Sequence, residues 1–145
     1  MSNNGDRKYK YLEFEKLVRD KNPDTIFASG GEANFKIISG DEKIRLLKEK
    51  LVEEANEVLD AKDDDEVVAE IGDVIDVLQQ IVKDLKIKKR LIRKSRRLKL
   101  KHRGKFKKGI YMYYVKFPAE VNENWMHKYK DITDKIEKLK EENCE

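Results

Sequence analysis

The chain has 145 residues, a length typical of one domain; 43% of them are charged, and the formal net charge is +4. No segment approaches the roughly eighteen consecutive apolar residues of a membrane span, so we expect no membrane partner. The N-terminus lacks the basic-then-apolar form of a secretory signal and the single Cys144 excludes an internal disulfide, so we expect a cytoplasmic protein.

The first forty residues predict little regular structure. Residues 25–29 favour a short helix closed by Gly30 and Gly31, and Pro23 disfavours a helical conformation at Asn22. Residues 33–38 alternate loosely between apolar and polar side chains, and residues 110–117 are rich in β-branched and aromatic residues. These two segments are candidates for a small two-stranded β-ribbon beside the helices.

Three longer helices are predicted over residues 41–61, 64–85 and 88–102, and together they indicate a mainly α fold. Asp41 is a candidate N-cap for the first helix, and Gly104 stands just past the third, where glycine is favoured. The apolar stripe expected to face the core consists of Leu47, Leu51, Ala55 and Val58 on the first helix, and Val67, Ile71, Val74, Leu78, Ile81 and Leu85 on the second.

A further amphipathic helix is predicted after Pro118. Its apolar residues recur at three- and four-residue steps: Val121, Trp125, Tyr129, Ile132, Ile136 and Leu139. Two interpretations stay open, because the stripe can pack on its own domain or contact another subunit. We therefore divide the chain into a domain of residues 1–118 and a C-terminal helical extension of residues 119–145.

Four acids are the strongest chemical signal. Glu54 and Glu57 project from one face of the first long helix, and Glu70 and Asp73 from one face of the second. A turn-like run of three aspartates at 63–65 allows the two helices to fold back antiparallel, so the four carboxylates would face one another. Such crowding is unfavourable unless a cation offsets it, and Mg²⁺ prefers oxygen ligands.

A plainer interpretation also exists. Acidic pairs three residues apart are common in a chain this rich in charge, and they usually mark a solvated helix face. Two observations favour the metal site: the acids adjoin the apolar stripes, and Gly72 stands mid-helix, where glycine costs about 1 kcal/mol relative to alanine. We interpret Gly72 as a sign of close approach by another part of the molecule.

The spacing Glu53-Glu54-x-x-Glu57 followed by Glu70-x-x-Asp73 resembles the signature of the MazG-type all-α nucleoside triphosphate pyrophosphohydrolases, which include phosphoribosyl-ATP pyrophosphohydrolase. Two other blocks are similar to segments of the same family. One is the run Lys16-Leu17-Val18-Arg19-Asp20-Lys21, and the other is Lys99 with the run from Arg103-Gly104 to Gly109-Ile110. The three blocks stand in the family's order and cover residues 14–115.

This resemblance implies a MazG-like helical bundle that hydrolyses a nucleoside triphosphate to the monophosphate and pyrophosphate, in the house-cleaning of nucleotide pools. It implies that Mg²⁺, or Mn²⁺ in its place, is held by the four acids Glu54, Glu57, Glu70 and Asp73. Glu53 would orient or deprotonate the attacking water, and the polyphosphate would be bound by Arg19, Lys21, Lys99 and Arg103. Relatives assemble as dimers or tetramers, so a homo-oligomer is expected.

Two alternatives remain. Hydrolysis of phosphoribosyl-ATP in histidine synthesis uses the same scaffold, and the acidic motif does not exclude it. The other alternative is a non-enzymatic module that binds nucleic acid, because residues 86–108 hold fourteen Lys or Arg and no acid. We do not favour nucleic acid as the partner, since that function leaves the regular spacing of the four carboxylates unexplained.

Overall fold

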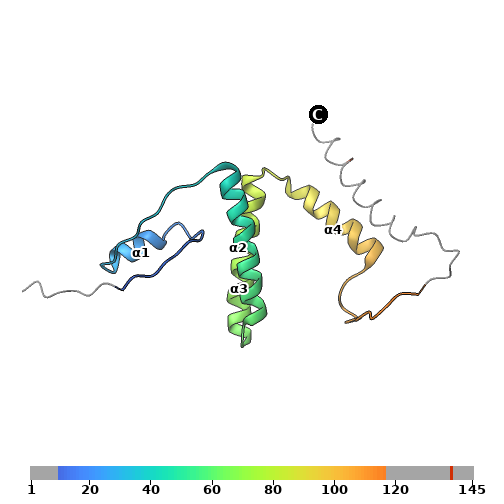
Figure 1. Cartoon of the computed structure of the whole chain (residues 1–145). Helices are drawn as coiled ribbons and strands as arrows, with labels where there is room; N and C mark the ends of the chain where they lie inside the picture. The colour runs from blue at the N-terminus through green and yellow to red at the C-terminus, as the bar shows by residue number, and fades with distance from the viewer. Residues whose placement is uncertain (1–9, 117–137, 139–145) are drawn as a thin grey trace, which may run out of the picture. The chain divides into compact units, whose positions relative to one another are not determined.

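The computed structural model describes residues 10–116 together with Lys138. Four α-helices lie in the described part: α1 (Asn22–Ala28), α2 (Gly40–Asp60), α3 (Asp64–Asp84) and α4 (Lys89–Arg103), shown in Figure 1. The chain divides into two compact units, Met1–Leu85 and Lys86–Glu145, so α4 belongs to the second unit and the other three helices to the first. The predicted mainly α fold is confirmed.

No strand occurs in the described residues, so the expected β-ribbon is not found there. Residues 33–38 and 110–116 are irregular. The preference of β-branched and aromatic residues for strands depends on a paired neighbour and a surface to pack on, and composition alone does not supply either. The predicted helix of residues 119–145, and with it the predicted boundary at residue 118, lies outside the described residues apart from Lys138.

The starts of two helices differ from the predictions. α1 begins at Asn22 rather than residue 25, because Pro23 falls in its first turn, where the missing N–H would have no intrahelical partner anyway. Ser39, rather than Asp41, is the N-cap residue of α2. Asp41 stands in the first turn of α2, where a negative charge is favourable beside the N-terminal end of the helix dipole.

The turn between α2 and α3 is fixed by a reciprocal cap. The Asp63 carboxylate accepts a hydrogen bond from the backbone N–H of Glu66 (2.9 Å), and the Glu66 carboxylate accepts one from the N–H of Lys62 (2.8 Å). This pattern satisfies two backbone donors at the start of α3. The chain therefore reverses at the predicted aspartate cluster.

α2 and α3 pack side by side as an antiparallel pair (Figure 1). At the end opposite the turn, Lys43 Nζ lies 2.7 Å from Asp84 Oδ2, which ties the start of α2 to the end of α3. Among the described residues, the only buried apolar side chain is that of Leu47, which is 4% exposed. The described part of the chain therefore forms a narrow helix–helix seam rather than a broad core.

Two acids lie on this seam where apolar residues were predicted. Glu54 is buried at 3% exposure and Glu70 is half-buried, whereas their neighbours Ala55 and Ile71 are exposed. Each predicted stripe is thus displaced by one residue at the acidic motif. Gly72 also differs from expectation, because a Cβ atom added there would meet no atom within 4 Å, so nothing in the described structure approaches it closely.

A second set of apolar side chains remains exposed on the helical pair. On α3, four residues at three- and four-residue steps are between 42% and 70% exposed, although two of them, Ile71 and Leu78, were predicted to face the core: Val68, Ile71, Ile75 and Leu78. On α2, Val52 and Leu59 are 61% and 80% exposed. Because successive residues of a helix advance by a fixed rotation, both sets fall on one side of the antiparallel pair.

None of the helices in the described part of the chain combines the length and the apolar composition that a membrane span needs.

Leu47→Ala should destabilise the chain by about 2–4 kcal/mol, because it removes the buried apolar side chain of the seam and leaves a cavity. Leu59→Ala is the matched control, since it makes the same change on an exposed part of the same helix. Urea unfolding followed by circular dichroism measures both changes. A loss at Leu59 as large as that at Leu47 would mean that another subunit buries the exposed face.

Candidate metal centre

Three carboxylates converge at the middle of the helical seam. Glu54 and Glu57 project from one face of α2 because they are three residues apart, and Glu70 reaches them from α3. One carboxylate oxygen from each residue lies within 4.8 Å of the others. The structure thus brings together three of the four acids that the sequence predicted as metal ligands.

Glu54 is the unusual member of this group. Its Oε1 atom lies 2.7 Å from Lys50 Nζ, while its Oε2 atom is buried without a hydrogen-bond partner in the described structure. The buried Oε2 atom of Glu70 likewise has no partner there. A buried carboxylate oxygen without a partner is costly, and a cation that accepts oxygen ligands would relieve it. Carboxylates alone are a donor set that suits the hard cations Mg²⁺ and Mn²⁺.

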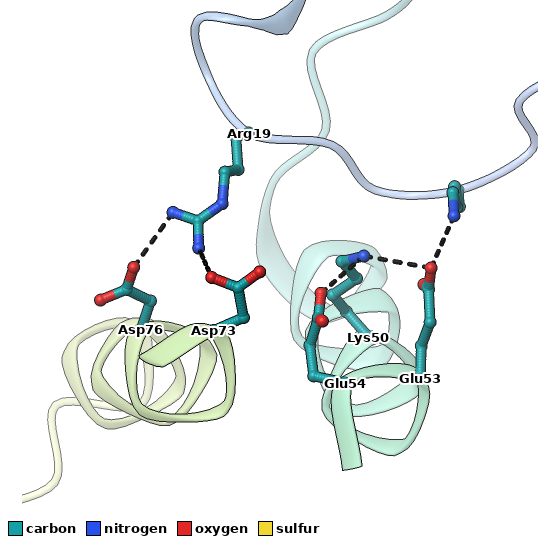
Figure 2. A network of polar contacts seen from close by, with 7 residues as sticks. Arg19, Lys50, Glu53, Glu54, Asp73 and Asp76 are labelled. Carbon is teal, nitrogen blue, oxygen red and sulfur yellow. Dashed lines mark hydrogen bonds and ion pairs between the residues drawn. The ribbon is translucent and has the colours of Figure 1, made fainter. Parts of the chain in front are cut away.

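Lys50 is a site residue that the sequence analysis missed. Its ammonium lies 2.7 Å from Glu54 Oε1 and 3.1 Å from Glu53 Oε1, one turn along α2 (Figure 2). Burial acts to lower the pKa of Lys50, but the hydrogen bonds to Glu54 and Glu53 outweigh it, and the pKa is raised. The signal was present in the sequence, because a lysine three and four residues before two glutamates faces both of them.

Glu53, predicted to act on the attacking water, is bound by two lysines. Lys16 Nζ lies 2.6 Å from its Oε1 atom, and Lys50 approaches the same atom. The hydrogen bond from Lys16 is the main reason that the pKa of Glu53 falls below its ordinary value; burial opposes this, and Lys50 adds to it. A carboxylate held ionised in this way accepts hydrogen bonds well but is a weak base.

Asp73, the fourth predicted ligand, is not one of the three clustered acids. Its Oδ1 atom accepts a hydrogen bond from Arg19 Nη2 (2.5 Å), and Arg19 Nη1 donates to Asp76 Oδ2 (3.0 Å), as Figure 2 shows. The hydrogen bond to Asp76 and the charge of Asp73 raise the pKa of Arg19 above its ordinary value. Arg19, predicted to bind the polyphosphate, lies beside these two acids.

The remaining residues predicted to bind phosphate are exposed and lie outside the acidic cluster. Lys21 precedes α1 and is exposed; its carbonyl accepts a hydrogen bond from Thr25 Oγ1 (3.0 Å). Lys99 and Arg103 stand four residues apart on α4, in the second unit, so they share one helix face, and both are exposed. Two lysines or arginines at this spacing can bind one anionic group together.

Comparisons of the chain with family models, curated proteins and solved structures find no match. The functional interpretation therefore depends on the geometry of the acids and on the three short motifs.

Mg²⁺ should raise the melting temperature of the full chain, and at a concentration about one hundred times its Kd it should stabilise the fold by about 2.7 kcal/mol. Glu57→Gln should remove most of this rise, because it replaces one of the three clustered carboxylates. Glu49→Gln is the matched control, since Glu49 is an exposed residue of the same helix that pairs with Arg45. Calorimetry measures the shift, and an equal rise in both variants would place the ion elsewhere.

Proposed function

We propose that the chain is a Mg²⁺-dependent nucleoside triphosphate pyrophosphohydrolase of the MazG type, in which Mn²⁺ can replace Mg²⁺. The observation that carries this proposal is the buried, unpartnered Oε2 atom of Glu54, clustered with Glu57 and Glu70 on the helical seam. A cation bound by the three carboxylates would give this buried atom a partner, which supports a metal site. The resemblance of the motifs around these acids supplies the reaction class.

The acids would hold the ion, and the ion would bridge phosphate oxygens and offset their charge. Glu54, Glu57 and Glu70 lie together and are three candidate ligands, and Asp73, one turn beyond Glu70, is the fourth. Lys50 binds Oε1 of Glu54, while Oε2 has no hydrogen-bond partner in the described structure. The chain itself therefore restrains the most buried candidate ligand through one of its two oxygens.

Water is the second reactant, and hydrolysis breaks the bond between the α and β phosphates with the consumption of one water molecule. Glu53 lies next to the buried ligand Glu54 and is held ionised by Lys16 and Lys50. This environment favours a role in orienting the water by accepting its hydrogen bond over a role in taking its proton. Arg19 and Lys21 are the first unit's candidates for binding the polyphosphate, and Lys99 and Arg103 are the second unit's.

The exposed apolar residues support a homo-oligomer, a dimer or tetramer that completes a shared bundle. Val68, Ile71, Ile75 and Leu78 follow the spacing of a helix-packing seam on α3, with no helix against them in the described residues. Val52 and Leu59 extend the same face on α2. An apolar stripe of this length on one side of a helical hairpin fits the equivalent stripe of another copy.

Pyrophosphate release from a panel of normal and damaged nucleoside triphosphates, and from phosphoribosyl-ATP, tests the reaction and identifies the substrate. Glu57→Gln should lower kcat about 100-fold or more, which corresponds to about 2.7 kcal/mol of transition-state stabilisation. Glu49→Gln should keep wild-type turnover, since its change lies outside the acidic cluster. Turnover by Glu57→Gln at the wild-type rate, or in excess chelator, would reject the proposal.

The basic helix α4 favours one competing function, the binding of nucleic acid. All nine of its lysines and arginines are exposed, and no acid occurs from residue 86 to 116. Such a surface binds phosphates through the release of counterions. It accounts for α4 and leaves the clustered acids of the first unit without a role.

Alanine substitutions along α4 separate the two functions. If α4 supplies a phosphate clamp, Lys99→Ala and Arg103→Ala should each lower kcat/KM about tenfold, a loss of about 1.4 kcal/mol. Lys94→Ala and Lys101→Ala are matched controls and should stay within about twofold of wild type. A nucleic-acid surface would instead show similar losses of RNA or DNA affinity at all four positions, each lowering the salt slope by about 0.7–0.9.

A further inference from the structure

Arg19 is shared between two carboxylates of α3. Its two terminal nitrogens donate to Asp73 and Asp76, which lie three residues apart and so project from one face of the helix (Figure 2). All three side chains are between 41% and 58% exposed. Exposed ion pairs are weak and exchange readily, so solvent or another ligand can compete for either carboxylate.

The two carboxylates differ in their distance from the acidic cluster. Asp73 is three residues from Glu70, one turn along α3, and so borders the cluster. Asp76 is six residues from Glu70, which places it about 9 Å further along the helix axis. An ion held by Glu70 and its neighbours can therefore recruit Asp73, whereas Asp76 lies out of its reach.

Arginine remains charged at all ordinary pH values, so Arg19 competes with any cation for Asp73. The segment that carries Arg19 has a second anchor, because Lys16 binds Glu53 on α2 at 2.6 Å. Loss of the contact between Arg19 and Asp73 would thus leave the segment attached to both helices, through Lys16 on α2 and through Asp76 on α3.

We propose that Asp76 is a positioning residue that keeps Arg19 beside the acidic cluster while Asp73 changes partner. When a divalent cation takes Asp73, Nη2 of Arg19 is released toward a phosphate oxygen of the substrate, and Nη1 stays on Asp76. Binding of the cation and binding of the polyphosphate are thereby coupled, and the coupling is reciprocal. The inference rests on the proposed function, because it takes Asp73 to be a metal ligand and the new partner of Arg19 to be a substrate phosphate.

A double-mutant cycle with Mg²⁺ alone as the probe tests the exchange. Titration calorimetry should show that Arg19→Ala binds Mg²⁺ about two- to fivefold more tightly than wild type, the effect of losing a competing exposed ion pair. The gain should vanish in the Asp73→Asn background, where Arg19 has no ligand to compete for. A gain that persists there would reflect the general loss of positive charge and would overturn the proposal, as would no gain at all.

Asp76→Asn tests the positioning role. Mg²⁺ affinity should stay within about twofold of wild type, because Asp76 is not a ligand, while KM for the triphosphate should rise about three- to tenfold with kcat little changed. Asp65→Asn is the control, a matched change in the exposed first turn of α3, and should leave both constants unchanged. A fall in kcat with KM unaltered would overturn the assignment.

Two further measurements keep the outcomes distinct. Far-UV circular dichroism confirms that each variant folds, and Arg19→Lys, which keeps the charge and loses the two-pronged contact, should give an intermediate Mg²⁺ affinity.

A wild-type chain that binds Mg²⁺ but hydrolyses no nucleotide would reject the proposed function, and the double-mutant cycle with Mg²⁺ would then decide the partner exchange by itself. A chain that binds no Mg²⁺ would overturn both.

Discussion

The burial of one carboxylate constrains the rest of the first unit. Glu54 lies between α2 and α3 at 3% exposure, where removing a charge from water is expensive unless nearby groups replace the lost hydration. Lys50 replaces part of it at Oε1, one turn away on the same helix. The second oxygen has no hydrogen-bond partner in the described structure, and the neighbouring Glu57 and Glu70 add negative charge, which is the basis for proposing a cation there.

The side of the helical pair that carries these acids is the side that draws in the N-terminal segment. Lys16 and Arg19 are separated from their partners by 37 to 57 positions in sequence, whereas α2 and α3 are joined by a short capped turn. Ordering a distant segment has an entropic penalty that the local pairing of α2 and α3 avoids. The acids that attach the segment, Glu53, Asp73 and Asp76, therefore border the acidic cluster without belonging to it.

The helices were largely predictable, and the errors at their faces are informative. Leu51 is followed at three and four residues by Glu54 and Ala55, and Val67 by Glu70 and Ile71, so periodicity alone allowed either member of each pair on the seam. Hydrophobicity selected Ala55 and Ile71, and the structure places Glu54 and Glu70 there instead. Sequence rules fail most often where function overrides the preference for an apolar interior. The partners of Arg19 and Glu53 were not predictable, because they depend on how a distant segment docks.

The placement of Glu70 rather than Ile71 on the seam also links the acidic site to the exposed apolar face. A rotation of α3 that turned Ile71 toward α2 would carry Glu70 out of the seam, since adjacent residues of a helix lie about 100° apart. With Glu70 inward, Ile71 joins Val68, Ile75 and Leu78 in an outward stripe, away from the side on which Arg19 contacts Asp73. A single helix pair thus cannot bury both the acids and all of its apolar residues. In the proposed assembly a second copy covers the outward stripe, so the register that gathers the carboxylates is also the register that exposes the apolar face on which that copy would pack.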